Sequence, residues 1–303
     1  MVSKPLLFYD SGAGGLPYLT AARACLPAER CIYLADRKNF PLGEKAEELV
    51  RQVVLESLSL AVERFAPRLV VIACNTASVV ALQVLREHFS IPFVGVVPAV
   101  KPAALSLAGG KLAVVSTRQT ASGPYLDKLI QEFADGREVI KVPVANLVDF
   151  AEYRYLSADP GERLASVRQA LAPLLRQEVQ AVVLGCTHFV LLEQEFRTVL
   201  TDRVALIDSR EGVTRRIVSL LAGGSAEPAD RGDEHRAPEG SAEPGSAETR
   251  PYPPEGARLA PPAQLAKRAE LYLHGGVEEQ ERYRAFARHF GLRYCGLLED
   301  AGR

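Results

Sequence analysis

Short apolar runs recur along this chain, and longer segments with helical periodicity separate them. Because strands and helices need different spacings of apolar residues, this alternation restricts the fold more than any other feature. Runs such as 69–73 and 181–184 are apolar throughout, which is typical of strands in parallel sheets covered by helices on both faces. The sequence therefore predicts an α/β fold with mainly parallel sheets.

The predicted strands extend over most of the chain. They lie near residues 6–9, 31–35, 69–73, 93–96, 111–115, 138–142, 181–185 and 204–207, with helices in most of the intervals. Because 303 residues are more than one compact core usually serves, we expect two lobes, or one domain with extra segments.

Residues 222–262 break this pattern. They hold 8 of the chain's 20 prolines and the near-repeat GSAEP, GSAEP, GSAET, but almost no large apolar side chains. Such a segment cannot bury enough surface to offset the entropy lost on ordering, so we predict a disordered surface insertion. The folded pattern resumes with a predicted strand at 270–273, a helix at 277–290 and a strand at 293–298.

Charge and hydropathy exclude several classes of protein. The 36 basic and 37 acidic residues nearly cancel and form no basic stripe, so we expect no nucleic-acid partner. No window has the long apolar run of a membrane span, and the apolar stretch before Asp10 is too short for a signal peptide. We therefore expect a soluble, cytoplasmic protein. Five cysteines without a CxxC pair argue against a disulfide framework and a zinc site.

Two segments resemble each other, VVIACNTASVVAL at 70–82 and VVLGCTHFVLLEQEF at 182–196. Each reads as a buried strand, a small residue, a cysteine, a hydroxyl or amide residue, and then a helix. The two cysteines, Cys74 and Cys186, are separated by about the length of one lobe. This pattern predicts an internal pseudo-duplication in which each half contributes one cysteine.

The position of these two cysteines at strand ends favours a functional role over a packing role. Ligands of open α/β sheets bind beyond the carboxyl ends of the strands, where helix N-termini present free N–H groups. A helix N-terminus stabilises a thiolate, and Asn75, Thr76 and Thr187 can hold a carboxylate. One such cysteine alone would more often be a packing residue. The matched pair favours function.

Two further residues stand near this pattern. Asp10 ends a predicted strand and opens a glycine-rich turn, which lacks the spacing of a phosphate-binding loop. We expect the turn to let backbone approach a small ligand while Asp10 reaches the site, and the alternative is that Asp10 caps a helix. His188 lies two residues after Cys186 and can influence its thiol, although a lone histidine is more often structural.

Taken together, these segments resemble the glutamate racemases of the cofactor-independent aspartate/glutamate racemase superfamily. The resemblance covers nearly the whole chain outside 222–262. It rests on DSGAGGL (10–16), FPLGEK (40–45), ACNTAS (73–78), IPFVGVVPA (91–99), KLAVVSTRQTASGPY (111–125), GCTHF (185–189) and ALIDS (205–209). It implies two pseudo-symmetric α/β lobes with an active-site cleft between them. Lobe one would comprise 1–98 plus 209–303, and lobe two 99–208.

The resemblance also implies the reaction, which is interconversion of L- and D-glutamate by proton transfer at the α-carbon without pyridoxal phosphate. Cys74 and Cys186 would be the paired acid and base, one on each face of that carbon, with no metal or organic cofactor. It assigns assisting roles to Asp10 beside Cys74 and to Glu152 and His188 beside Cys186. The implied substrate contacts are Asp10, Ser11, the backbone of Pro41, Leu42 and Gly43, and Asn75, Thr76 and Thr187.

The resemblance implies that the protein supplies D-glutamate for peptidoglycan and works in the cytoplasm. Because many members of the family self-associate, a homodimer is one expected state. Three stretches depart from the family pattern. Leu42 stands where the family has tyrosine, residues 35–39 are more charged, and the run before Glu152 differs, so that an exposed helix carboxylate is the alternative there. Two alternatives therefore stay open, a racemase of aspartate or another small carboxylate, and a carboxylate-binding protein that has lost catalysis.

Overall fold

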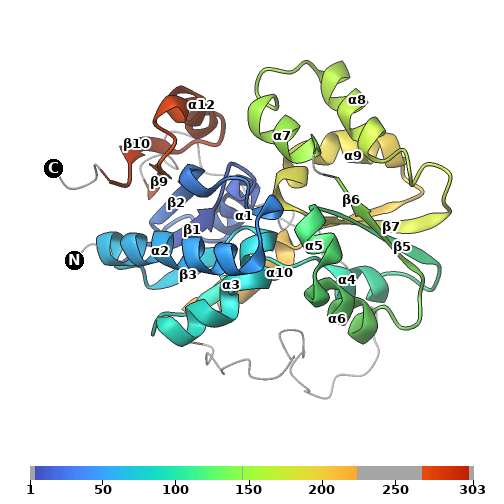
Figure 1. The fold of residues 1–303 in the computed structure, drawn as a ribbon, viewed down its shortest axis with the longest axis horizontal. Helices are drawn as coiled ribbons and strands as arrows, with labels where there is room; N and C mark the ends of the chain where they lie inside the picture. Colours follow the sequence, from blue (N-terminus) through green and yellow to red (C-terminus); the bar gives the residue numbers. More distant parts are fainter. Residues whose placement is uncertain (1–3, 145, 224–267, 300–303) are drawn as a thin grey trace.

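The computed structural model describes residues 4–144, 146–223 and 268–299 (Figure 1). Apart from its first two residues, the predicted insertion at 222–262 lies outside the described residues. The described chain forms two parallel sheets with helices on both faces, which confirms the predicted α/β class. Among the described residues, no helix is both long and apolar enough to cross a lipid bilayer.

The first sheet has six strands in the order β10-β9-β2-β1-β3-β4, and every pair is parallel. Its strands are β1 (Leu6–Asp10), β2 (Cys31–Asp36), β3 (Leu69–Ile72), β4 (Phe93–Gly95), β9 (Ala269–His274) and β10 (Arg293–Leu297). The last two strands confirm the pattern predicted beyond residue 262. They extend a sheet that is otherwise built from the first hundred residues, so the chain returns to where it began.

The second sheet has four parallel strands in the order β6-β5-β7-β8. They are β5 (Lys111–Ser116), β6 (Val139–Pro143), β7 (Val179–Gly185) and β8 (Ala205–Ile207). The assignment of residues 1–98 plus 209–303 and 99–208 to separate lobes stays a prediction.

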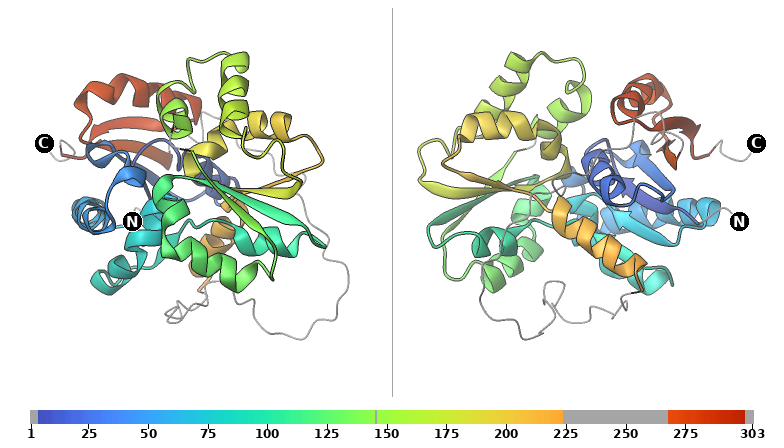
Figure 2. Two further views of the ribbon diagram at one scale, coloured as in Figure 1. Left: turned by 45° about the vertical axis from the view of Figure 1, so that its right-hand side comes forward. Right: turned by 180° about the vertical axis from the view of Figure 1, so that it is seen from behind.

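Helices cover both faces of each sheet (Figure 2). Alternate residues of β1 show why, because Leu7 and Tyr9 pack against one group of helices and Leu6 and Phe8 against another. The α-helices are α1 (Leu16–Cys25), α2 (Glu47–Phe65), α3 (Asn75–His88), α4 (Val100–Leu105), α5 (Arg118–Ser122), α6 (Pro124–Phe133), α7 (Asn146–Tyr153), α8 (Pro160–Ala170), α9 (Glu193–Leu200), α10 (Arg210–Leu221) and α12 (Gln280–His289). The short 3-10 helices are η1 (Arg37–Asn39), η2 (Leu42–Glu44), η3 (Thr187–Leu192) and η5 (Val277–Glu279).

The hydrophobic core runs from one sheet into the other. One cluster of buried side chains contains Phe8 of β1 and Tyr283 of α12 together with Leu184 of β7 and Phe196 of α9. The facing surfaces of the two sheets are therefore joined by continuous apolar packing. This packing fixes the carboxyl ends of strands from both sheets relative to one another.

Candidate active site

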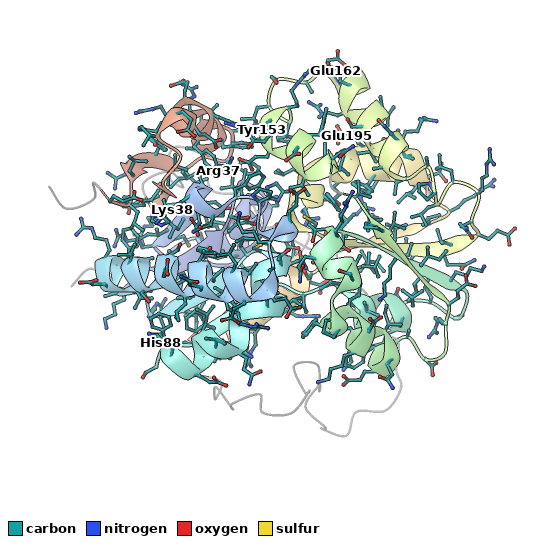
Figure 3. The ribbon with its side chains drawn as sticks, in the orientation of Figure 1. Arg37, Lys38, His88, Tyr153, Glu162 and Glu195 are labelled. Atoms are coloured by element: carbon teal, nitrogen blue, oxygen red, sulfur yellow. The ribbon has the colours of Figure 1, made fainter. Side chains whose placement is uncertain are left out.

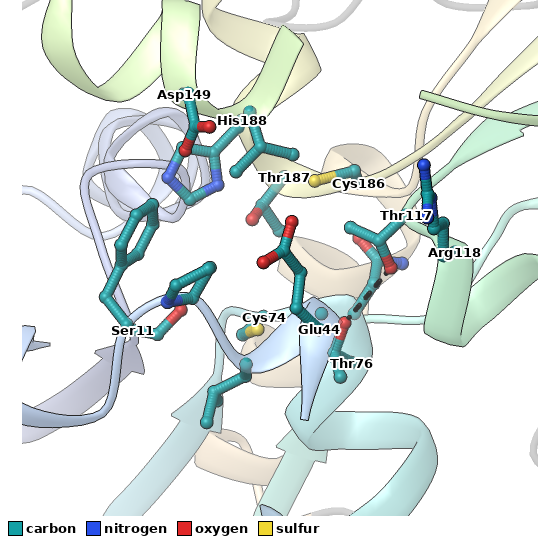
Figure 4. Close-up of a pocket in the computed structure, with 16 residues that line it drawn as sticks. Ser11, Glu44, Cys74, Thr76, Thr117, Arg118, Asp149, Cys186, Thr187 and His188 are labelled. Atoms are coloured by element: carbon teal, nitrogen blue, oxygen red, sulfur yellow. Dashed lines mark hydrogen bonds between the residues drawn. The ribbon is translucent and has the colours of Figure 1, made fainter. Parts of the chain in front are cut away.

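A pocket lies at the carboxyl ends of strands from both sheets (Figure 4). Ser11 follows β1, Cys74 follows β3, Thr117 follows β5 and Cys186 follows β7. The full lining is Ser11, Phe40, Pro41, Leu42, Gly43, Glu44, Cys74, Asn75, Thr76, Thr117, Arg118, Val148, Asp149, Cys186, Thr187 and His188. Every predicted site residue except Asp10 and Glu152 is in this lining.

The two matched cysteines occupy equivalent positions in the two sheets. Cys74 precedes α3 with backbone angles φ −138° and ψ 122°, and Cys186 precedes η3 with φ −141° and ψ 133°. Both side chains are buried, with 7% and 5% of their surface exposed, and both line the pocket. A difference from the predicted pattern is that a 3-10 helix follows Cys186, and the α-helix begins only at Glu193.

The environment of Cys74 favours the neutral thiol. Burial and the nearby charge of Asp10 raise the pKa of Cys74 well above its usual value, and the N–H groups of Ala77 and Thr76 only partly oppose them. The stabilisation of a thiolate that we expected from a helix N-terminus is therefore outweighed at this cysteine.

The environment of Cys186 is dominated by a charged pair. His188 Nε2 lies 3.0 Å from Glu152 Oε2, and both side chains are buried. Burial by itself lowers the pKa of His188, but hydrogen bonds to Cys186 and Glu152 outweigh it and raise this pKa to about 10. Burial would raise the pKa of Glu152, but the bond from His188 and the charge of Arg37 lower it to about 2. The pair is therefore imidazolium and carboxylate near neutral pH.

Glu152 lies behind the pocket lining. It belongs to α7 and is 1% exposed, so the alternative of an exposed helix carboxylate is wrong. Its Oε2 also accepts a hydrogen bond of 2.8 Å from the N–H of Ala13. It reaches the pocket through His188.

Asp10 does not line the pocket, but it is hydrogen-bonded to Thr187, which does. Its Oδ2 accepts a hydrogen bond of 2.9 Å from Thr187 Oγ1, which joins the end of β1 to the residue after Cys186. Its Oδ1 accepts from the N–H of Gly12 at 2.9 Å. The alternative that Asp10 caps a helix is wrong, because α1 begins at Leu16 and Gly15 occupies the cap position.

The glycine-rich turn after Asp10 packs on protein side chains at Gly12 and Gly14, while Ser11 of the same turn lines the pocket. A Cβ on Gly12 would lie 2.6 Å from Glu152 Oε2 and 2.8 Å from His188 Nε2. A Cβ on Gly14 would lie 2.5 Å from His188 Nδ1. Glycine is needed at both positions because the turn packs directly on the histidine.

A polar group without a partner points to a ligand in this pocket. Asn75 is 2% exposed, and among the described residues neither its side-chain oxygen nor its nitrogen has a hydrogen-bond partner. A buried amide with no partner is costly, and a bound carboxylate would satisfy its N–H₂ group. Nearby, the hydroxyls of Thr76 and Thr117 lie 3.4 Å apart and bring α3 against the residue that follows β5.

Several residues of this site were not predicted from the sequence. Thr117 and Arg118 directly follow a predicted strand, so the rule that ligands bind at strand ends could have found them. Phe40, Glu44, Val148 and Asp149 carry no such signal. Within the part of the chain that the structure describes, no three His, Cys, Asp or Glu side chains gather as a metal site would require.

Known proteins resemble the chain in sequence and in structure. Residues 18–216 match the family model described as Asp/Glu/Hydantoin racemase. The glutamate racemase of Klebsiella pneumoniae is 43% identical over 218 residues, which cover 71% of this chain and 76% of that protein. The glutamate racemase of Sphingopyxis alaskensis is 43% identical over 222 residues, which cover 72% of this chain and 82% of that protein.

A solved structure agrees over almost the full length. It is Escherichia coli glutamate racemase in complex with L-glutamate and the activator UDP-MurNAc-Ala, with a TM-score of 0.77 and 31% identity. The match covers 97% of this chain and 98% of that one. On these grounds and on the extent of the family match, the chain belongs to the Asp/Glu/Hydantoin racemase family.

Proposed function

We propose that this protein is a glutamate racemase that interconverts L- and D-glutamate by proton transfer at the α-carbon. The observation that carries the proposal is that Cys74 and Cys186, which follow strands of different sheets, line one pocket. The glutamate racemases that are 43% identical over about 220 aligned residues support the choice of substrate. The unpaired amide of Asn75 in the same pocket supports a carboxylate ligand.

Two thiols suit this reaction because the product is the mirror image of the substrate. A thiolate on one side takes the α-proton, so that the C–H bond breaks and an S–H bond forms. The electron pair is left on a planar carbanionic intermediate. The thiol on the other side then gives its proton to the opposite face, and that sulfur is left as the thiolate. Each turnover exchanges the protonation states of the two cysteines and inverts the carbon.

The surroundings of the two sulfurs are unequal in a way that suits these roles. Burial and Asp10 hold Cys74 as a thiol, ready to donate a proton. The imidazolium of His188, which lines the pocket together with Cys186, places a positive charge where negative charge develops during the reaction. We infer that Cys74 is the proton donor of the pair in the resting enzyme. The buried surroundings exclude water and strengthen these charge effects.

The test is incubation of the purified protein with L-glutamate and no added pyridoxal phosphate, followed by chiral separation of the product. D-Glutamate should form, and the Cys74→Ser and Cys186→Ser variants should lose turnover in both directions. Cys31→Ser is a matched control, because Cys31 is also buried but does not line the pocket. A double Cys74→Ser, Cys186→Ser variant that racemises at the normal rate would refute the mechanism.

The two alternatives from the sequence are not favoured. The relatives at 43% identity are glutamate racemases, and both cysteines line the pocket. A panel of four-carbon and five-carbon substrates tests the aspartate alternative, which a preference for aspartate would support. Exchange of the α-proton in D₂O tests the loss of catalysis, because a binding protein would show no exchange.

The proposed reaction implies a role in the cell. We propose that the product D-glutamate enters peptidoglycan, that the enzyme works in the cytoplasm and that it forms a homodimer. Growth of a strain that requires D-glutamate, after expression of this chain, tests the first point. Fractionation and sedimentation test the other two.

A further inference from the structure

The carboxylate of Glu152 is held by residues from four separate parts of the chain. Besides the bonds from His188 and Ala13, its Oε1 accepts a hydrogen bond of 2.7 Å from the hydroxyl of Tyr283. Arg37 forms an ion pair with the same oxygen, with Nη1 at 3.4 Å. Both oxygens of this buried carboxylate are therefore occupied by donors.

The guanidinium of Arg37 is itself fixed on several sides. It forms an ion pair with Glu279 of η5, and its Nη2 donates to the hydroxyl of Tyr153 at 3.0 Å. Its central carbon lies 3.9 Å from the centre of the Phe40 ring. Figure 3 shows Arg37 beside Tyr153, where α7 faces the first sheet. A buried charge with so many partners is held in one orientation.

Neither Arg37 nor Tyr283 lines the pocket, so neither can contact a substrate there. Their path to the reaction runs through Glu152 to His188, which lines the pocket together with Cys186. Tyr283 belongs to α12 in the segment that follows residue 267. The segment after residue 267 is thus linked by hydrogen bonds, through Glu152 and His188, to the pocket that contains Cys186.

We propose that Arg37 and Tyr283 are positioning residues for the racemase reaction, which hold Glu152 so that it keeps His188 in the imidazolium form beside Cys186. This inference rests on the proposed function. Its physical basis is that a buried carboxylate stays ionised only while donors surround it. If these donors are removed, the state in which Glu152 and His188 are both neutral becomes more stable relative to their ion pair. The pocket then loses the cation that lies in its lining together with Cys186.

The test uses Tyr283→Phe, which removes one hydroxyl and keeps the ring, and Arg37→Met, which removes the charge and keeps an apolar stem. Nitrogen NMR of ¹⁵N-histidine-labelled protein reports the protonation of His188, and the chain has only 5 histidines, so a His188→Gln spectrum assigns the signal. In each variant the signal near pH 7 should move from imidazolium toward neutral imidazole. The Arg37→Lys variant should recover part of the shift.

Kinetics provide the second measurement. The kcat of Tyr283→Phe should fall about tenfold, since a hydrogen bond to a charged group is lost, while KM stays within about twofold. Tyr18→Phe is the matched control, because Tyr18 is equally buried and its hydroxyl lies 3.1 Å from Ser209, outside this network. The control should lose stability to a similar degree and keep its kcat.

The results separate the two proposals. If folded Tyr283→Phe and Arg37→Met keep both the wild-type His188 signal and the wild-type kcat, the inference is wrong. It is equally wrong if Tyr18→Phe lowers kcat as much as Tyr283→Phe does. If the wild-type protein does not racemise glutamate, the proposed function fails, yet the His188 signal still tests the link between these residues.

Discussion

Replacement of Gly12 with alanine should disable the Cys186 side of the site while the chain still folds. The added Cβ would lie 2.6 Å from Glu152 Oε2 and 2.8 Å from His188 Nε2, whereas ordinary contacts begin at 3.4 Å. Both side chains must therefore retreat by more than half an ångström. These atoms form the 3.0 Å bond between His188 and Glu152, so the retreat acts directly on that charged pair.

The expected losses of stability and turnover in Gly12→Ala follow from this crowding. Overpacking of a buried site costs about 1–3 kcal/mol, which in a chain of this length lowers Tm by about 2–5 °C. A shift of about 1 Å in reacting groups can lower turnover about 100-fold. The larger effect should therefore fall on kcat for D-glutamate formation, and the thermal melt should remain cooperative.

The matched control is Gly212→Ala. Gly212 lies in α10, and a Cβ there would have no neighbour within 4 Å in the part of the chain that the structure describes. Because alanine is the better helix former, this variant should keep its kcat and gain about 0.5–1 kcal/mol. If Gly12→Ala instead keeps both wild-type turnover and wild-type Tm, the close packing of the turn on His188 does not constrain the site.

Three further outcomes are expected. Asn75→Ala should raise KM for glutamate about 10- to 100-fold with little loss of Tm, because the amide has no partner in the unliganded protein. The Thr117→Val variant should lower the free energy of unfolding by about 1 kcal/mol, measured with urea, because the Thr117 hydroxyl caps α5. The pKa of His188 is raised from 6.5 to about 10, so its stabilisation is complete below about pH 6.5 and lost as the pH rises through 10. The pKa of Glu152 is lowered from 4.5 to about 2, so its stabilisation is present above about pH 4.5 and lost as the pH falls through 2. His188→Gln should remove most of the alkaline decline in Tm, and a decline equal to that of the wild type would contradict this assignment.

Local pattern was enough to predict the strands and the two cysteines. The apolar runs of β1, β3, β5 and β7 are readable because strand burial imposes its own residue pattern. Cys74 and Cys186 were found because each directly follows such a run, and the carboxyl ends of parallel strands gather at one edge of a sheet. No information on distant contacts was needed for this step.

What only the tertiary structure decided is which distant groups meet these residues. Nothing near Tyr283 in the sequence indicates that its hydroxyl reaches Glu152, since the position of α12 depends on β9 and β10, which flank it in the chain and belong to the first sheet. The role of Gly12 likewise depends on a histidine far along the chain. Charge states follow the same rule, because burial and partners from other elements set the pKa values of His188 and Glu152. Residue type and spacing are local properties, but desolvation and hydrogen bonding depend on the packing of the whole chain.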